Sequence, residues 1–320
     1  MGLRSGQHIG AYVIDTLLGR GGMASVWRAW DKRRDEAVAI KIMADPLYAG
    51  GQFADRFIGE IRHHARLNHP HIVQVREVFS VAGQPCMVMD LAPGGSLASM
   101  IENSPQQRLP CAITLPLIIQ VLDALDYAHR QSIVHRDVKP SNVLLDASRT
   151  HAYLSDFGIA LAAGETRLTK MGVSVGTGAY MSPEQIIATG PIDHRSDVYS
   201  VGCVLYESLT GQPPFVVKGA TGMRDDAART ALFEMHLYQQ PVPPRQLVPE
   251  IPAHVSALVM RALEKDPARR IQGCAEFAAA LKAPDGDAVQ GRPLSPAMRI
   301  AAAVLLLAVI AMSAAVIVSN

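Results

Sequence analysis

Residues 135–142 read His135-Arg136-Asp137-Val138-Lys139-Pro140-Ser141-Asn142, and they decide how the rest of the chain is interpreted. Asp137 supplies a carboxylate that can orient an attacking hydroxyl and accept its proton. The side-chain oxygen of Asn142 suits Mg²⁺, which prefers oxygen ligands. Lys139 can offset negative charge on a transferred phosphoryl group. The stretch therefore predicts phosphoryl transfer to a hydroxyl, with Asp137 and Lys139 as catalytic residues and Asn142 as a metal ligand.

A second metal ligand is predicted downstream. Asp156-Phe157-Gly158 follows the apolar stretch Ala152–Leu154. Asp156 would bind the cation that bridges the phosphates, Phe157 would pack inside, and Gly158 would allow a turn. Three such residues alone would also fit an ordinary turn at a strand end. Their position shortly after Asn142 favours the metal site.

A glycine-rich segment lies near the N-terminus, between two predicted strands. It consists of Leu18, Gly19, Arg20, Gly21, Gly22, Met23, Ala24, Ser25 and Val26. Glycines let a backbone lie close to phosphates, where a Cβ would collide. A dinucleotide-binding turn would lead into a helix, whereas this segment leads into a strand. We predict a loop that covers the phosphates of ATP, with an ordinary hairpin turn as the alternative.

Lys41 ends the apolar run Val38-Ala39-Ile40. A lysine on a strand is usually solvated, but a lysine that follows such a run needs a partner for its charge. The phosphates of ATP and the carboxylate of Glu60, on the next predicted helix, would serve. Lys41 and Glu60 are therefore predicted to belong to the catalytic site.

The predicted elements change in kind along the chain. Strands are expected at Tyr12–Leu18, Ser25–Ala29, Ala37–Met43, Val73–Phe79 and Cys86–Leu91, with one helix at 52–67. Longer helices are expected at 113–131, 196–210, 229–239 and 253–264. Residues 216–230 are polar, and we interpret them as a solvated surface insertion.

In this order the motifs resemble those of the eukaryotic-like protein kinase family, and within it the membrane-anchored bacterial Ser/Thr kinases. The resemblance covers residues 10–282. It rests on GRGGMASV, VAIK, Glu60, LNHPHIV (67–73), HRDVKPSN, DFG, Gly176-Thr177, SPE (182–184), DVYSVG (197–202) and Arg270. It implies an α+β, two-lobed fold: an antiparallel sheet plus one helix in an N-lobe (10–92) and a mostly helical C-lobe (93–282). Ala24 replaces the third loop glycine, a position where family members often vary.

The resemblance also implies further roles. The cofactors would be ATP and Mg²⁺, with Mn²⁺ as a second usable ion. The adenine would lie beside the gatekeeper Met89, bond the Asp90 carbonyl and the Ala92 amide, and be sandwiched by Val26, Ala39 and Leu144. Glu184 would pair with Arg270, and Asp197 would brace the catalytic loop.

Lys139 after Asp137, together with Thr177, is similar to the form seen in Ser/Thr kinases, which implies protein serine and threonine hydroxyls as substrates. Arg136 would need an anionic partner beside the catalytic loop. The segment from 158 to 182 carries hydroxyls whose phosphorylation would supply that anion: Thr166, Thr169, Ser174 and Thr177. We therefore expect autophosphorylation through a transient homodimer, first at Thr169 and second at Ser174, with solvated loop hydroxyls as the alternative. Thr177 is expected instead to contact Asp137 and Lys139.

Two alternatives to an active protein kinase are considered. One is a membrane-tethered pseudokinase that binds partners without catalysis; the presence of Lys41, Asp137, Asn142 and Asp156 argues against it. The other is a small-molecule phosphotransferase on a related fold. Residues 182–215, which contain the substrate-side elements of protein kinases, argue against that one.

The composition narrows the class of partner and the compartment. The 320 residues are 49% apolar and 18% charged, which indicates a mostly globular chain. Thirty basic and 29 acidic residues balance to a net charge of +1, so we expect no nucleic-acid partner. The four cysteines contain no CxxC pair, which fits a reducing cytosol better than a disulfide framework.

The C-terminal end has a different composition. Residues 283–298 are rich in Pro, Gly and Asp and are interpreted as a juxtamembrane linker. Residues 300–318 carry no charge, proline or glycine, and as a helix they would span roughly 28 Å. We predict a transmembrane helix at 299–318, with a buried C-terminal helix as the alternative. Arg292 and Arg299 precede it, which predicts a single-pass cell-membrane protein with its kinase domain in the cytoplasm.

Overall fold

The computed structural model describes residues 4–20, 24–43, 66–81, 83–157, 178–188, 190–217 and 225–283. Several predicted features lie outside these ranges: Gly21, Gly22, Met23, Glu60, nearly all of the helix predicted at 52–67, the hydroxyls of 158–177, and residues 284–320. The chain divides into one unit at Met1–Lys282 and another at Ala283–Asn320. The fold below is that of the first unit.

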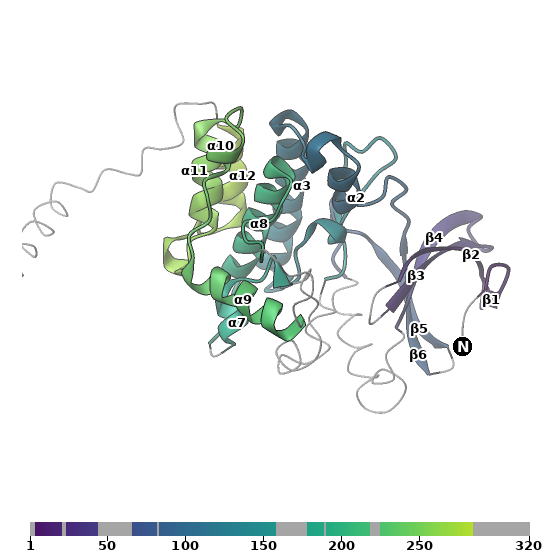
Figure 1. The fold of residues 1–320 in the computed structure, drawn as a ribbon. Coiled ribbons are helices and arrows are strands. Elements are labelled where there is room, and N and C mark those ends of the chain that lie inside the picture. The colour runs from purple at the N-terminus through teal and green to yellow at the C-terminus, as the bar shows by residue number, and fades with distance from the viewer. Residues whose placement is uncertain are drawn as a thin grey trace, which may run out of the picture. The chain divides into compact units, whose positions relative to one another are not determined.

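The N-terminal half of this unit is a six-stranded antiparallel sheet (Figure 1). Its strands are β1 (His8–Ile9), β2 (Tyr12–Arg20), β3 (Ala24–Asp31), β4 (Glu36–Met43), β5 (Val75–Val81) and β6 (Gln84–Asp90), in the order β1-β2-β3-β4-β6-β5.

The central strand β4 buries side chains on both of its faces. Val38, Ile40 and Ile42 join the apolar cluster on one face, and Ala39 and Met43 join a second cluster on the other. Side chains alternate between the faces of a strand. The same alternation therefore places Lys41 on the face that carries Ala39 and Met43, and this face lines the candidate site.

The other half is mainly helical (Figure 1). Its helices are α2 (Leu97–Glu102), α3 (Cys111–Arg130), α7 (Pro183–Ile187), α8 (Arg195–Thr210), α9 (Asp225–Tyr238), α10 (Pro244–Leu247), α11 (Ala253–Ala262) and α12 (Cys274–Lys282), with a small hairpin of β7 (Val143–Leu145) and β8 (Ala152–Leu154). Helix α8 lies at the centre, and nearly all its residues are buried. Gly202 permits this packing, because a Cβ there would lie 2.9 Å from the Cβ of Ala262 on α11.

Helix α3 is the one candidate, within the described part of the chain, that is long and apolar enough to cross a membrane. It also supplies Leu117, Ile118, Val121, Leu122 and Leu125 to the main hydrophobic core. We therefore interpret α3 as a core helix of the C-terminal half. The segment predicted to cross the membrane, 299–318, lies outside the described residues.

Most predicted helices and strands appear within a few residues of their expected bounds, but two expectations were wrong. Residues 225–230 are not a solvated loop: α9 begins at Asp225, and Ala228 and Leu232 are buried. These two side chains are one helical turn apart and share the apolar face of α9. Arg66 and Leu67 are not helical, and Leu67 is buried in the core.

Arg270 ties the short helix α7 to the body of the C-terminal half. Its Nη1 and Nη2 donate to the two carboxylate oxygens of Glu184 at 2.6 and 2.7 Å, which confirms the pair implied by the resemblance. Other donors of the guanidinium reach the carbonyls of Glu264, Lys265 and Arg195. Burial by itself would raise the pKa of Glu184, but the bonds from Arg270 hold it below its usual range.

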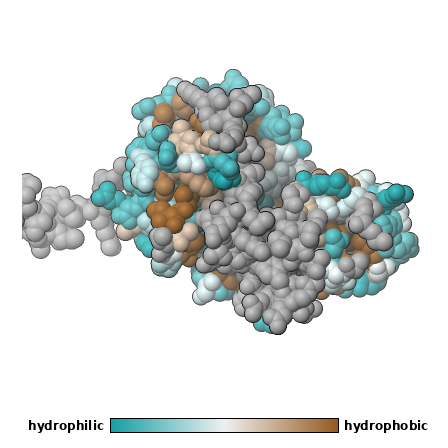
Figure 2. All heavy atoms as spheres, turned by 60° about the horizontal axis from the view of Figure 1, so that its bottom comes forward, coloured by the Kyte–Doolittle hydropathy of each residue, from teal (hydrophilic) through white to brown (hydrophobic). Residues whose placement is uncertain are grey.

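The surface carries exposed apolar side chains in both halves, among them Leu18 and Trp30 on strands and Ile187 and Tyr238 on helices. On the face drawn in Figure 2, the hydrophobic areas are separate patches between hydrophilic ones. Scattered exposed apolar residues are ordinary in soluble domains.

Candidate active site

The predicted catalytic loop is held from beneath by α8. The buried carboxylate of Asp197 accepts hydrogen bonds from the backbone amides of His135 and Arg136, each at 2.8 Å, and contacts His129 Nε2 at 2.7 Å. Burial by itself would raise the pKa of Asp197, but the bond with His129 and the neighbouring donors lower it. Asp197 therefore braces the loop as a carboxylate, which confirms the role implied by the resemblance.

Two residues of the 135–142 motif, Lys139 and Asn142, converge on the carboxylate of Asp137. Lys139 Nζ donates to the two carboxylate oxygens of Asp137 at 3.1 and 2.8 Å. Asn142 Nδ2 donates to the backbone carbonyl of Asp137 at 2.8 Å and to its Oδ2 at 3.1 Å. The amide nitrogen of Asn142 is thus turned toward Asp137, so its carbonyl oxygen is the atom that could bind a cation. The Asp137 side chain is 28% exposed, which leaves it accessible to a substrate hydroxyl.

Asp156 follows the end of strand β8 and lies beside the catalytic loop. Lys41 Nζ, which comes from β4, contacts Asp156 Oδ1 at 2.7 Å. Burial by itself would raise the pKa of Asp156, but the Lys41 ammonium holds it below its usual range. Sequence reasoning assigned Lys41 to Glu60 and missed this contact, because Lys41 and Asp156 lie far apart in the chain. The Lys41–Glu60 pair stays a prediction.

The backbone links the two predicted metal ligands. The amide and hydroxyl of Ser155 both donate to the carbonyl of Asn142, at 2.9 and 3.0 Å. His135 Nε2 lies 2.8 Å from the Ser155 carbonyl, and its ring meets that of Phe157 edge-on at 4.6 Å. Phe157 is buried, as predicted. These contacts hold the residue before Asp156 against the catalytic loop.

Two residues of the site have left-handed backbone conformations. Arg136 has a φ of 65° and Asp156 a φ of 67°. This conformation costs a non-glycine residue about 1–2 kcal/mol, which the surrounding contacts must offset. The same conformation occurs at residues outside the site, among them Asp35, Ser132 and Ala188, so it does not by itself identify a functional residue.

The residues expected to contact adenine gather in one apolar cluster. Ala39 and Met89 are buried members, and Val26 and Leu144 pack against them. Val26 comes from the sheet and Leu144 from the β7–β8 hairpin, so both halves contribute to the cluster. The other expected nucleotide contacts lie at strand ends: Leu18, Gly19 and Arg20 end β2, Ala24 and Ser25 begin β3, Asp90 ends β6, and Ala92 follows it.

Sequence reasoning missed Arg76, on β5. Its guanidinium bonds the side chain of Asp90 and that of Glu36 on β4. Asp90 is thereby held to the sheet at the point where the chain leaves it. The backbone amide of Asp90 also donates to the carbonyl of Gln74 at 3.0 Å.

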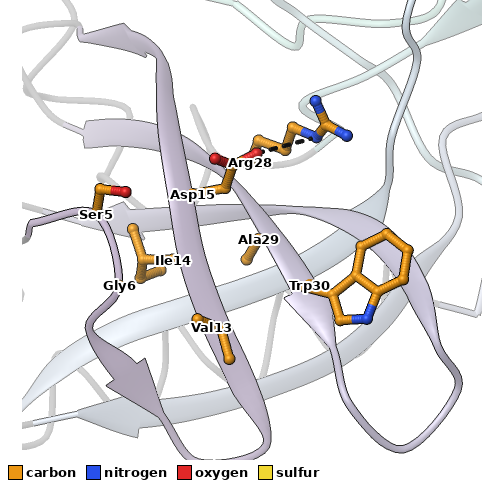
Figure 3. A pocket seen from close by; sticks show the side chains of 8 residues that line it. All are labelled: Ser5, Gly6, Val13, Ile14, Asp15, Arg28, Ala29 and Trp30. Atoms are coloured by element: carbon orange, nitrogen blue, oxygen red, sulfur yellow. Dashed lines mark ion pairs between the residues drawn. The ribbon is translucent and has the colours of Figure 1, made fainter.

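Among the described residues, one pocket is lined by both halves and another lies on the sheet. A small one of about 30 Å³ lies beside Asp156 and Phe157 and is lined by Ile72, Val73, Val75, Met87, Met89 and Ser155. A larger one of about 370 Å³ lies on β2 and β3 (Figure 3), where Arg28 and Asp15 form an ion pair at 3.4 Å. No predicted site residue lines the larger pocket, so the candidate active site is the region around Asp137 and Asp156.

Comparison with known proteins gives consistent matches. The protein kinase domain family matches residues 12–283. Serine/threonine-protein kinase PknE of Mycobacterium tuberculosis is 36% identical over 289 residues, which cover 90% of this chain and 49% of PknE. PknH of the same species is 37% identical over 89% of this chain and 44% of PknH. The probable serine/threonine-protein kinase SCO3848 of Streptomyces coelicolor is 38% identical over 84% and 39%. The chain thus spans about half, or less, of the length of these relatives.

Solved structures agree with the sequence matches. The crystal structure of the Mycobacterium tuberculosis PknI kinase domain superposes with a TM-score of 0.68 at 28% sequence identity. The likeness covers 88% of this chain and 98% of that one. It therefore includes both the antiparallel sheet and the helical half.

Proposed function

The chain belongs to the protein kinase family and has its two-lobed fold, and from that premise we propose that it transfers the γ-phosphoryl group of ATP to serine and threonine hydroxyls of proteins. The main support for this proposal is the set of contacts among the predicted catalytic and metal-binding side chains. Lys139 and Asn142 contact Asp137, and Lys41 contacts Asp156. A pseudokinase is not favoured, because the acid, the lysine and both metal ligands are all present.

Each of these side chains has a proposed role. Asp137 orients the substrate hydroxyl and accepts its proton, and Lys139, which already contacts Asp137, offsets charge on the transferred group. Lys41 binds the α- and β-phosphates. Glu60, outside the described residues, is proposed to hold Lys41 when nucleotide binds.

The chemistry of the donor set fits Mg²⁺, and Mn²⁺ as a second ion. Asn142 and Asp156 offer hard oxygen atoms, and two protein ligands suffice for an ion that also binds phosphates and water. The bound ion would neutralise charge on the phosphates. The apolar cluster of Val26, Ala39, Met89 and Leu144 is proposed to hold the adenine, with Asp90 and Ala92 bonding its edge and the 18–26 segment over the phosphates.

Phosphate transfer to a protein acceptor tests the function. With radiolabelled ATP and Mg²⁺, we expect label on a general acceptor such as casein, found as phosphoserine and phosphothreonine. We also expect label on this chain within 158–182, with Thr169 first, because phosphate there would pair with Arg136. A mixture of active and inactive chains would show whether the reaction occurs in trans, within a transient homodimer. Absence of transfer to any protein, or transfer to an aminoglycoside instead, would contradict the proposal.

We further propose that residues 299–318 anchor the chain in the cell membrane as a single span, after a linker at 283–298, with the kinase domain in the cytoplasm. The uncharged composition and length of 300–318 support this, as do Arg292 and Arg299 before it. Full-length protein is expected in the membrane fraction, and a version ending near residue 290 should be soluble with unchanged kinase activity. Full-length protein in the soluble fraction without detergent would contradict the anchor.

A further inference from the structure

Gln185 joins helix α7 to the catalytic loop through both ends of its side-chain amide. Its Oε1 accepts a hydrogen bond from the backbone amide of Ser182 at 3.0 Å. Its Nε2 donates to the backbone carbonyl of Arg136 at 2.8 Å. Gln185 is 5% exposed, so water competes little for these bonds.

The orientation of this amide follows from its partners. Ser182 presents an N–H, which only donates, and Arg136 presents a carbonyl, which only accepts. Turning the amide over would place two donors together at one end and two acceptors at the other. The contact with the loop therefore requires the NH₂ group of a glutamine.

The carbonyl that Gln185 holds belongs to the peptide unit between Arg136 and Asp137. The N–H of that same unit, on Asp137, contacts His135 Nδ1 at 3.2 Å. The preceding N–H, on Arg136, donates to Asp197. The left-handed φ of 65° at Arg136 is thus held by bonds on both sides. A change of ψ at Arg136 would turn this peptide unit and displace the Cα of Asp137, and with it the carboxylate.

Helix α7 is a firm support for this contact. Glu184, next to Gln185, is bound by buried Arg270, and it also accepts from the Ser196 hydroxyl at 2.6 Å. The Ser182 hydroxyl donates to that of Ser196 at 3.2 Å. The position of α7 is therefore set by α8 and by the Arg270 segment, independently of the catalytic loop.

We propose that Gln185 is a positioning residue for phosphoryl transfer, which sets the orientation of the Asp137 carboxylate by donating from its amide to the Arg136 carbonyl. This rests on the proposed kinase function. Gln185 should affect turnover and not nucleotide binding, because it contacts neither the adenine cluster nor Lys41 or Asp156 among the described contacts.

Gln185→Glu tests the hydrogen bond that Gln185 Nε2 donates to the Arg136 carbonyl. The substitution keeps size and shape, and an oxygen can still accept from Ser182. At high pH the ionised carboxylate has no hydrogen to give to Arg136, so two acceptors face each other. At lower pH the protonated carboxyl can donate again, and burial beside a carbonyl favours that form.

Neighbouring charged groups also affect the pKa of the carboxyl group in Gln185→Glu. Asp137 on the catalytic loop, Asp197 on α8 and Glu184 on α7 favour the protonated form. The guanidinium groups of Arg136 and Arg270 oppose it. Wild-type enzyme has the same five groups and a glutamine that does not titrate, so the ratio of variant to wild-type kcat removes their own pH effects.

The test compares kcat and KM for ATP in purified full-length enzyme. Gln185→Glu should lower kcat about tenfold or more near pH 8, with KM for ATP within about twofold of wild type. The kcat ratio should rise severalfold as pH falls from about 9 to about 6. Gln185→Met, which never donates, should lose kcat at every pH without that rise. Gln239→Glu, at an exposed position just after α9, should match wild type.

Nucleotide-binding stoichiometry gives the folded fraction by which each kcat is corrected, so a merely unstable variant is recognised. A wild-type kcat for Gln185→Glu near pH 8, a flat pH ratio, or an increase in KM for ATP that accounts for the loss would each overturn the proposal. If wild-type enzyme and Gln239→Glu both fail to phosphorylate protein, it is the proposed function that fails.

Discussion

Asp137→Asn is expected to lower kcat by about 10²- to 10⁴-fold, the usual range for removal of a general base. The new amide cannot accept the substrate proton. It would also bring an NH₂ group, or lose an acceptor, where Lys139 Nζ and Asn142 Nδ2 both donate to the present carboxylate. Nucleotide affinity should change little, because Asp137 faces the hydroxyl and not the adenine cluster.

Steady-state kinetics with a protein acceptor and nucleotide titration by calorimetry measure the two quantities separately. Asp226→Asn is a suitable control, because this carboxylate on α9 is 86% exposed and pairs only with Arg229 among the described contacts. Turnover of Asp137→Asn within about threefold of wild type would show that another group accepts the proton.

Lys41→Met is expected to reduce kcat/KM by about 10²- to 10³-fold, as loss of one preorganised charge contact typically does. The variant loses the proposed phosphate ligand and also leaves Asp156 without the ammonium 2.7 Å away. An uncompensated carboxylate in a partly buried site is costly, and the pKa of Asp156 should rise in the variant.

Lys41→Met should also lower the Tm, by an amount that depends on pH. A carboxyl whose folded-state pKa is lowered stabilises the fold above its unfolded pKa, and this stabilisation disappears as pH falls through the folded pKa. In wild type Lys41 provides it for Asp156. The difference in Tm between wild type and Lys41→Met should therefore be largest near neutral pH and should shrink as pH falls below about 3.9, the ordinary pKa of an aspartate.

Thermal unfolding across this pH range, with the exposed Lys32→Met as control, separates the effect from general loss of a lysine. A Tm difference that is constant with pH would mean that the Lys41–Asp156 contact contributes nothing to folding. Unchanged kcat/KM would remove Lys41 from the site.

Much of the site could be predicted from local sequence because its chemistry is concentrated in short stretches. The motif at 135–142 contains Asp137, Lys139 and Asn142, and the structure shows them in mutual contact. Side-chain alternation in β4 predicts which face carries Lys41. The alternation and the helical periods also place most strands and helices, because burial of one face is encoded at spacings of two and of three to four residues.

Other features depend on chain segments that only folding brings together. Residue 41 meets residue 156, Arg76 holds Asp90 and Glu36, and the start of α9 at Asp225 follows from packing of Ala228, which the polar sequence of 216–230 conceals. No local pattern specifies such partners, since a hydrogen-bonding group in a sequence is compatible with many others.

The sequence by itself determined the family, the residues that can perform the chemistry and the order of the elements, because these reside in short motifs and in the periodicity of apolar side chains. Only the tertiary structure decided several of the contacts: Asp156 beside Lys41, Arg76 beside Asp90, and Gln185 at the carbonyl of Arg136. The physical reason is that hydrogen bonds and ion pairs act over a few ångströms of space. Their partners are therefore chosen by how α7, α8 and the sheet pack, and not by distance along the chain.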